Sequence, residues 1–237
     1  MTTQRKPSQM LKQAAIIALL VTTASGCSVR VKNYVEIAQR AFETPDDVSL
    51  SIQEIKDYPY AAQYIRVDNR PRALMALAFD DDNVLKWRTG GDEIIHTRHG
   101  RFIGSVNISD AIAHTDNLDA DPLVCLKRNL KEPSQCPTMW QRKVWITSAT
   151  EKNLKDSVLT YSSEFAVLGT EQWTHPDTTE LTVYKIEETS ELFTNIFYVE
   201  QKTGRTVKSR QFVAPGTGYV EIEEVKPYAN DLKAVNE

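Results

Sequence analysis

The chain has 237 residues, of which 41% are hydrophobic and 25% are charged, and its formal net charge is −4. Such a chain can bury one sizeable core without needing a second domain. A moderately acidic protein is a poor candidate for binding nucleic acid through charge, and an acidic polysaccharide would need a local basic patch. We therefore expect no nucleic-acid partner.

Residues 1–26 have the pattern of a secretory signal peptide. Three basic residues precede the apolar run 14–23, and small residues at 24–26 lead to Cys27. The apolar run is about half as long as the roughly 20 residues that a membrane-spanning helix needs. Removal of this segment would change the formal net charge from −4 to −7, because it carries three basic residues and no acidic one.

Small residues directly before Cys27 resemble the lipobox of bacterial lipoproteins, although Ala24 stands where leucine is usual. In such proteins the cysteine receives diacylglycerol, the chain is cleaved before it, and the new amine is acylated. Several acyl chains anchor a protein stably to a bilayer. We therefore expect lipidation at Cys27, a lipidated tether over 27–32 and insertion of the acyl chains into the lipid leaflet of the outer membrane. The alternative is an ordinary secretory peptide with a chance cysteine.

The residue after the cysteine predicts which of the two membranes holds the protein. In the sorting rule of enterobacterial lipoproteins, aspartate at this position retains the protein in the inner membrane. Ser28 stands here. The expected location is thus the periplasmic face of the outer membrane.

The remaining chain predicts a single antiparallel β domain over 33–228, followed by a tail at 229–237. Apolar spacing over 33–43 indicates a short amphipathic helix, and 44–57 is a polar approach to the strands. One helical turn is expected over 109–113.

From residue 62 onward the pattern is β, with short connections that suit hairpins and leave no room for helical crossovers. The expected strands are 63–67, 73–79, 84–89, 93–98, 101–107, 139–147, 158–161, 164–168, 181–187, 193–200, 205–213 and 219–225. The predicted fold class is mainly all-β, a large antiparallel meander sandwich or barrel-like domain with a short N-terminal helix.

Two cysteines remain when Cys27 is set aside. Cys125 and Cys136 lie in an irregular segment rich in proline, asparagine and aspartate. An exported chain meets an oxidising compartment, so the two predict a disulfide. The alternative is a metal site, which would need ligands beyond two thiolates, and no histidine lies close to either cysteine in the sequence.

No catalytic residue, metal site or cofactor is expected. His96 and His99 flank a turn between strands, where side chains diverge. The run Asp80-Asp81-Asp82 lacks the spaced ligands and closing glutamate of a calcium loop. Paired carboxylates for glycoside hydrolysis leave no fixed spacing in a sequence, so that interpretation stays open.

Aromatic and basic side chains supply the candidate contacts with a partner or glycan. A tryptophan such as Trp87 could stack on a sugar ring, but aromatic residues in β proteins more often pack in the core. Lys208 and Arg210 share a strand face and could extend with Arg101 into a basic patch. The alternative for these three is a solvated surface.

Several stretches resemble the YjbF/GfcB family of group 4 capsule polysaccharide lipoproteins. Trp87-Arg88-Thr89, followed by the hairpin at 97–103, is similar to a tryptophan and a Gly-Arg-aliphatic hairpin of that family. The stretch 197–215 is similar to its Thr-Gly, Arg-Ser-Arg-Gln and Pro succession. Asn69-Arg70-Pro71 departs from an expected Gly-Arg-Pro, and the segment with Cys125 and Cys136 has no assigned counterpart.

The resemblance implies a predominantly antiparallel β fold and a role in capsule or exopolysaccharide production. It implies a non-enzymatic accessory or scaffold protein whose partners are outer-membrane or periplasmic exopolysaccharide-export proteins of the same operon. The alternatives are a glycan-binding module, with polysaccharide as a direct ligand, and a polysaccharide-modifying enzyme.

Overall fold

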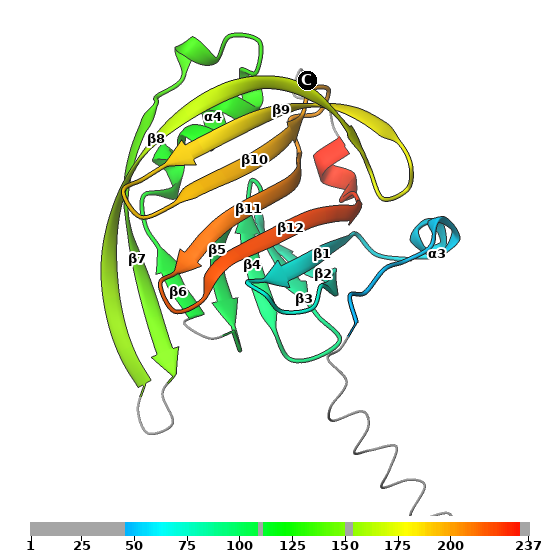
Figure 1. Ribbon diagram of the computed structural model, residues 1–237, viewed down its shortest axis with the longest axis horizontal. Coiled ribbons are helices and arrows are strands. Elements are labelled where there is room, and N and C mark those ends of the chain that lie inside the picture. The colour runs from blue at the N-terminus through cyan, green and yellow to red at the C-terminus, as the bar shows by residue number, and fades with distance from the viewer. Residues whose placement is uncertain (1–45, 109–110, 150–153, 233–237) are drawn as a thin grey trace, which may run out of the picture. The chain divides into compact units, whose positions relative to one another are not determined.

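The computed structural model describes residues 46–108, 111–149 and 154–232. Within these ranges twelve antiparallel strands form one strongly curved sheet (Figure 1). The predicted signal peptide, Cys27, the tether 27–32 and the helix expected at 33–43 lie outside the described residues. The mainly β class and the antiparallel, barrel-like arrangement are confirmed.

The order of strands in the sheet follows the order in the chain. The strands are β1 (Ala62–Val67), β2 (Ala73–Asp81), β3 (Val84–Arg88), β4 (Ile94–Arg98), β5 (Arg101–Val106), β6 (Ala111–Thr115), β7 (Met139–Ala149), β8 (Leu154–Thr174), β9 (Glu180–Thr189), β10 (Thr194–Glu200), β11 (Thr206–Ala214) and β12 (Gly218–Lys226). Strands that follow one another in the chain pair with each other, except β5 and β6. Because β12 also pairs with β1, β5 and β6 are the two edges of the sheet.

The two edges meet through side chains. The hydroxyl of Ser105 on β5 accepts a hydrogen bond from the backbone N–H of Ile112 on β6, at 3.3 Å. The hydroxyl of Thr115 donates to the carbonyl of Ile103, also at 3.3 Å. These bonds satisfy part of the exposed backbone that edge strands otherwise present. The sheet is therefore nearly closed.

A two-residue turn joins β4 to β5. His99 and Gly100 both have positive φ angles, 54° and 85°, and Arg98 pairs with Arg101 across the turn. Such turns favour glycine because both central positions are left-handed. A Cβ atom on Gly100 would lie 2.2 Å from the hydroxyl of Thr206, so glycine is also what lets this hairpin approach the start of β11.

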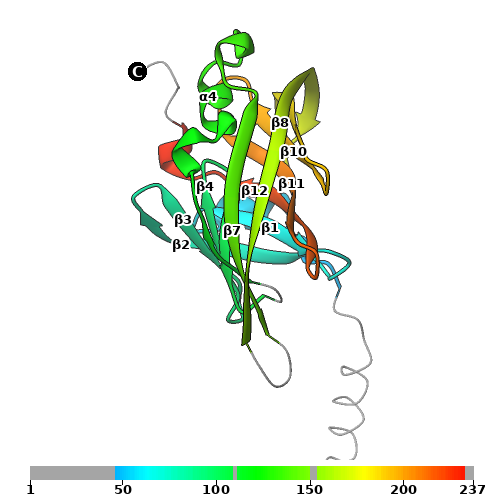
Figure 2. The ribbon, with the colours of Figure 1, turned by 90° about the vertical axis from the view of Figure 1, so that its left-hand side faces the viewer.

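The structure corrects two of the sequence predictions, a helical turn and a break between two strands. The helical turn expected over 109–113 is replaced by strand β6, since residues 111–115 pair with β7. The two short strands expected at 158–161 and 164–168 are parts of β8, which has 21 residues and pairs with β7 along one half and β9 along the other. Figure 2 shows the long β7–β8 pair running the full height of the sheet.

Several short helices lie before, between and after the strands. The helix α3 (Ile52–Asp57) lies in the segment expected to be a polar approach, and a capping box of Ser51 and Glu54 begins it. The helix α4 (Pro122–Arg128) and the turns η1 (Leu118–Ala120) and η2 (Pro133–Gln135) lie in the segment expected to be irregular. The turn η3 (Ala229–Leu232) lies in the expected tail. None of the helices in the described ranges is long and apolar enough to cross a bilayer.

The core has two main parts. One lies inside the curved sheet and includes Met75, Trp87 and Ile95. The other lies beneath α4, where Leu123 and Leu126 pack with Phe197 and other strand residues. Burial of Leu123 and Leu126 in this second cluster holds α4 against the sheet.

Candidate functional site

A polar cavity of about 500 Å³ lies beside α4. Its lining residues come from β1 to β4, from β11 and β12, from the turn before β11, from α4 and from the segment around η3. Figure 1 shows α4 and the red turn η3 at the same end of the sheet. The cavity therefore gathers residues from both ends of the described chain.

Gln63 of β1 is a buried amide in the wall of this cavity. Its side chain is 7% exposed, and its Nε2 donor has no hydrogen-bond partner among the described residues. Buried polar groups are nearly always hydrogen-bonded, so an orphaned donor calls for an explanation such as an absent ligand.

Lys127 of α4 is one of the basic residues that line the cavity. Its Nζ donates a hydrogen bond to the backbone carbonyl of His99, at 3.0 Å. In the described part of the chain it forms no ion pair with a carboxylate within hydrogen-bonding distance. Burial, together with weaker repulsion from Arg128, lowers the pKa of Lys127 to about 8, although the carboxylates of Asp231, Asp121 and Glu224 oppose this shift.

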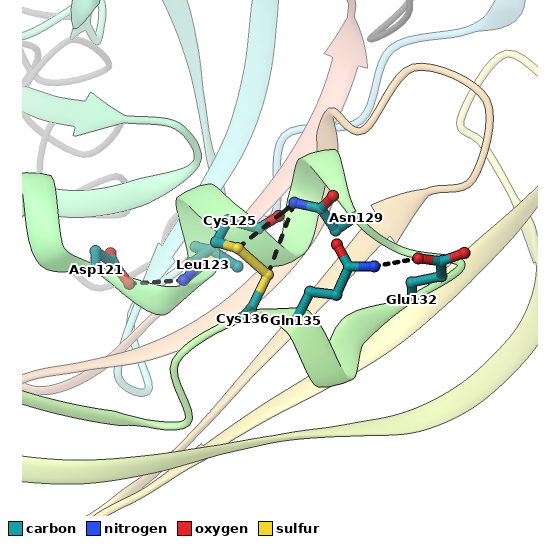
Figure 3. Close-up of a disulfide and its surroundings, with 7 residues drawn as sticks. All are labelled: Asp121, Leu123, Cys125, Asn129, Glu132, Gln135 and Cys136. Carbon is teal, nitrogen blue, oxygen red and sulfur yellow. Dashed lines mark hydrogen bonds between the residues drawn. A yellow bond between two sulfur atoms is a disulfide. The ribbon is translucent and has the colours of Figure 1, made fainter.

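Two attachments hold α4 in place, a cap at its first turn and a disulfide from its middle. Asp121 caps the first turn, because its carboxylate accepts a hydrogen bond from the N–H of Leu123 at 3.0 Å, and Pro122 follows at the first helical position. A disulfide joins Cys125, within α4, to Cys136 (Figure 3). The sequence-based prediction of this pair thus agrees with the structure.

Other basic groups around the cavity are already engaged. Arg205 lies between two carboxylates, with Nη1 2.6 Å from Glu200 and Nε 3.0 Å from Glu224. The ammonium of Lys226 donates to the backbone carbonyls of Lys56 and Tyr58. Among the lysines of the lining, Lys127 and Lys226 form no ion pair with a described carboxylate, and Lys127 has fewer hydrogen-bond acceptors than Lys226.

A buried ionic network lies deeper, beneath α4. The carboxylate of Glu188 on β9 is fully buried between two guanidinium groups, 2.8 Å from Arg101 Nη1 and 2.7 Å from Arg142 Nη1. Arg101 also forms a two-point ion pair with Asp121, the capping residue of α4. The network thereby connects strands β5, β7 and β9 to the helix that carries Lys127.

The groups of this ionic network also have further hydrogen-bond and aromatic partners. Ser163 and the amide of Asn195 donate to Glu188 at 2.8 and 2.9 Å, and both guanidinium groups lie over the ring of Trp140. Burial would raise the pKa of Glu188, but the two arginines outweigh it and hold that pKa at about 2. The carboxylate therefore stays ionised at neutral pH, and the network acts as a fixed structural element.

The four residues predicted to contact a partner or glycan do not form one surface. Trp87 is 6% exposed, donates a hydrogen bond from Nε1 to the hydroxyl of Thr97, and lines the cavity from inside. Arg101 is 3% exposed and belongs to the ionic network, so it does not extend a basic face.

Lys208 and Arg210 lie on the outside of the sheet. The Nζ of Lys208 is 3.9 Å from Glu223, and Lys208 also borders the cavity. Arg210 lies over the ring of Tyr219 and is 3.7 Å from Glu221. Their charges are offset by neighbouring glutamates, so the basic patch expected from these two and Arg101 does not form.

The candidate metal-binding and acidic residues remain apart. In the described ranges no three histidine, cysteine or acidic residues come together in a way that could hold a metal ion. His96 lies on β4, whereas His99 is the first residue of the turn that follows this strand. Asp81 pairs with Lys86, and Asp80 accepts a hydrogen bond from Tyr228.

Gln63, Lys127 and Glu188 were not singled out from the sequence. A partial signal existed for Lys127, since Asp121-Pro122 is typical of a helix start and would have placed α4 within the disulfide loop. No local signal distinguishes Gln63 or Glu188 from exposed strand residues, because their roles depend on distant partners.

Comparison with known proteins identifies relatives across most of the chain. A family model described as "Group 4 capsule polysaccharide lipoprotein gfcB, YjbF" matches residues 35–225. The uncharacterized lipoprotein GfcB of Escherichia coli K12 is 26% identical over 221 residues, which cover 90% of this chain and 97% of that protein. The uncharacterized lipoprotein YjbF of the same organism is 30% identical over 140 residues, or 59% of this chain and 65% of that protein.

The fold also has a solved counterpart. The crystal structure of the hypothetical lipoprotein YmcC from Escherichia coli K12 aligns with a TM-score of 0.63 at 24% identity, covering 76% of this chain and 90% of that one. At this identity the likeness shows the fold alone. The family match spans far more than half of the sequence, and the stretches that resemble the family lie within it. The chain therefore belongs to the group 4 capsule polysaccharide lipoprotein family of GfcB and YjbF.

Proposed function

We propose that this protein is an outer-membrane lipoprotein that faces the periplasm and acts as a non-enzymatic accessory or scaffold in capsule or exopolysaccharide production and export. The observation that carries the proposal is the family match over residues 35–225. The names of its relatives, which are lipoproteins, support an acyl anchor at Cys27. Its proposed partners are the outer-membrane or periplasmic export proteins made with it.

The structure supports the scaffold role through rigidity. A nearly closed sheet leaves few free backbone groups, and the buried network of Arg101, Glu188 and Arg142 ties its strands together. A rigid body presents its surface to a partner without an ordering cost, which favours association. A second candidate function, binding of a glycan, is favoured by the polar cavity beside α4.

Replacement of Cys27 by serine tests the anchor. We expect Cys27→Ser to move the protein from the membrane fraction to the soluble periplasm, because the thiol that carries the lipid is lost. Capsule production in a deletion strain complemented with this variant should fall to the level of the empty strain. Membrane fractionation, mass spectrometry of the N-terminal peptide and measurement of surface polysaccharide provide the readouts.

A matched variant separates lipidation from location. Ser28→Asp keeps the acylated cysteine and should redirect the protein to the inner membrane, with the same loss of capsule. Equal membrane association of wild type and Cys27→Ser, with no acyl mass on the wild-type peptide, would refute the anchor. Normal capsule with both variants would refute the requirement for an outer-membrane location.

A further inference from the structure

We infer that the cavity beside α4 binds the carboxylate of an acidic sugar residue, and that the ammonium group of Lys127 holds this carboxylate. The inference rests on the proposed function, which brings the protein to a polysaccharide, and it deepens that function by naming the class of saccharide. Three features of the cavity carry it: an ammonium group without a carboxylate partner, an orphaned amide donor and a set of carboxylate acceptors.

The first feature is the distribution of positive charge. Arg205 is neutralised by Glu200 and Glu224. Lys127, in contrast, has one backbone carbonyl as its hydrogen-bond acceptor within the described residues, although an ammonium group can donate three bonds. A carboxylate beside Lys127 would compensate its burial and add a charge-assisted hydrogen bond.

The second feature is Gln63. It is nine-tenths buried, lines the same cavity and leaves its Nε2 donor without a partner in the described chain. A sugar hydroxyl or ring oxygen in the cavity would accept this bond. Sites built to hydrogen-bond a polar ligand discriminate strongly against analogues that leave the buried group unpaired.

The third feature distinguishes a sugar acid from a phosphate. Asp80, Glu224 and Asp231 border the cavity together with the hydroxyl of Ser209. Carboxylates accept hydrogen bonds from sugar hydroxyls, but they repel a doubly charged phosphate. A ligand with one negative charge and several hydroxyl groups therefore suits this lining better than an inorganic anion does.

The size of the cavity agrees with such a ligand. Its volume of about 500 Å³ lies within the range of roughly 300–1,000 Å³ that is usual for small-molecule sites. The aromatic ring of Trp87 forms part of the wall, so its emission provides a spectroscopic signal for occupancy.

Calorimetric titration of the full acylated protein in detergent tests the inference. The probes are short oligogalacturonides and oligoglucuronides, each compared with the same oligosaccharide after chemical reduction of its carboxyl groups to alcohols. We expect the acidic probes to bind at least about tenfold more tightly than the reduced ones, because only they engage Lys127. This comparison needs no variant and is independent of any change in folding.

Two variants assign the effect to the cavity. Lys127→Gln should weaken binding of the acidic probe by about tenfold or more and leave binding of the reduced probe unchanged. The matched control is Lys143→Gln, an exposed lysine on β7 outside the cavity lining, which should bind like wild type. Gln63→Leu should weaken both probes, since it removes a donor that does not depend on charge.

The pH profile gives a further readout. With a pKa of about 8, Lys127 is protonated below that pH and loses its charge above it, so binding of the acidic probe should weaken as pH rises through 8. The charged groups that act on Lys127 are Asp231, Asp121, Glu224 and Arg128, and the neighbouring His99 has its pKa lowered to about 4 by burial. The reduced probe should show no such decline.

Absence of binding by both acidic probes, equal binding of acidic and reduced probes, or wild-type affinity in Lys127→Gln would each overturn the inference. These results concern a purified protein and a saccharide. The test of the proposed function concerns Cys27, location and capsule in cells, so failure of the inference is distinguishable from failure of that function.

Discussion

Replacing Glu188 with alanine is expected to lower the free energy of unfolding by about 3–5 kcal/mol. The carboxylate is fully buried between Arg101 and Arg142, so its removal leaves two guanidinium groups without their shared counter-ion in the interior. Arg101 would retain Asp121, whereas Arg142 has no other carboxylate partner in the described ranges. Urea denaturation followed by far-UV circular dichroism measures the loss.

Glu187 provides the matched control for this change. It is the preceding residue on β9, its side chain is not fully buried, and it forms no ion pair with another described residue. Glu187→Ala should therefore change the free energy of unfolding by less than about 0.5 kcal/mol, as is usual for surface substitutions. Similar losses for the two variants would show that the ionic network does not hold the sheet together.

Acid should destabilise the protein through the same carboxylate. The pKa of Glu188 is about 2 in the folded protein, below its ordinary value of 4.5, because the two arginines outweigh the effect of burial. A depressed pKa contributes stability that is present above pH 4.5 and is lost as pH falls toward 2. The melting temperature of wild type should fall as the pH is lowered from 4.5 toward 2, and this fall should be smaller for Glu188→Gln. Parallel curves for the two proteins would contradict this assignment.

The strands could be predicted because local turn chemistry marks them. His99-Gly100 and Asp82-Asn83 both adopt the positive φ angles of tight hairpins, and alternating side chains flank them. Strand β6 could not be predicted in the same way, since it has no hairpin on its N-terminal side and pairs with β7 across the disulfide segment. Ser162 and Ser163 looked like a break in β8, yet Ser163 faces inward and bonds Glu188.

The sequence contains capping signals for both helices, but the prediction of a mainly β domain did not use them. Ser51 and Glu54 form the capping box that begins α3, and this spacing is visible in the sequence. Asp121-Pro122 likewise marks the start of α4. Both helices are only one to two turns long, so their apolar residues are too few for a helical period to stand out from the strand pattern.

The candidate site was harder to predict because its partners are distant in sequence. Arg101 and Glu188 are separated by 87 residues, and each looks like a solvated strand residue when considered alone. Alternation tells which residues share a face of a strand, but in this sheet charged residues are also buried on the inner face, so alternation does not separate exposed from buried charges. The curvature of the sheet brings side chains of β5, β7 and β9 together. Arg101, which the sequence suggested to lie on the surface, is therefore buried.

Removal of the disulfide by Cys125→Ser with Cys136→Ser is expected to cost about 3 kcal/mol of unfolding free energy, because the bond closes a short loop that is otherwise free in the unfolded chain. The two cysteines are 11 residues apart, and the loop between them contains most of the segment from α4 to η2. Thermal unfolding of wild type and the double variant, each with and without a reductant, measures the effect.

Reductant should lower the stability of wild type to that of the double variant and leave the variant unchanged. Equal midpoints for the two oxidised proteins would contradict the prediction. The loss of the disulfide should also affect the cavity, because Lys127 lies two residues beyond Cys125, whereas the ion pair of Asp121 with Arg101 holds only the start of α4. With the disulfide gone, one of these two attachments is lost, so binding of an acidic saccharide should weaken while the ionic network of Glu188 stays intact.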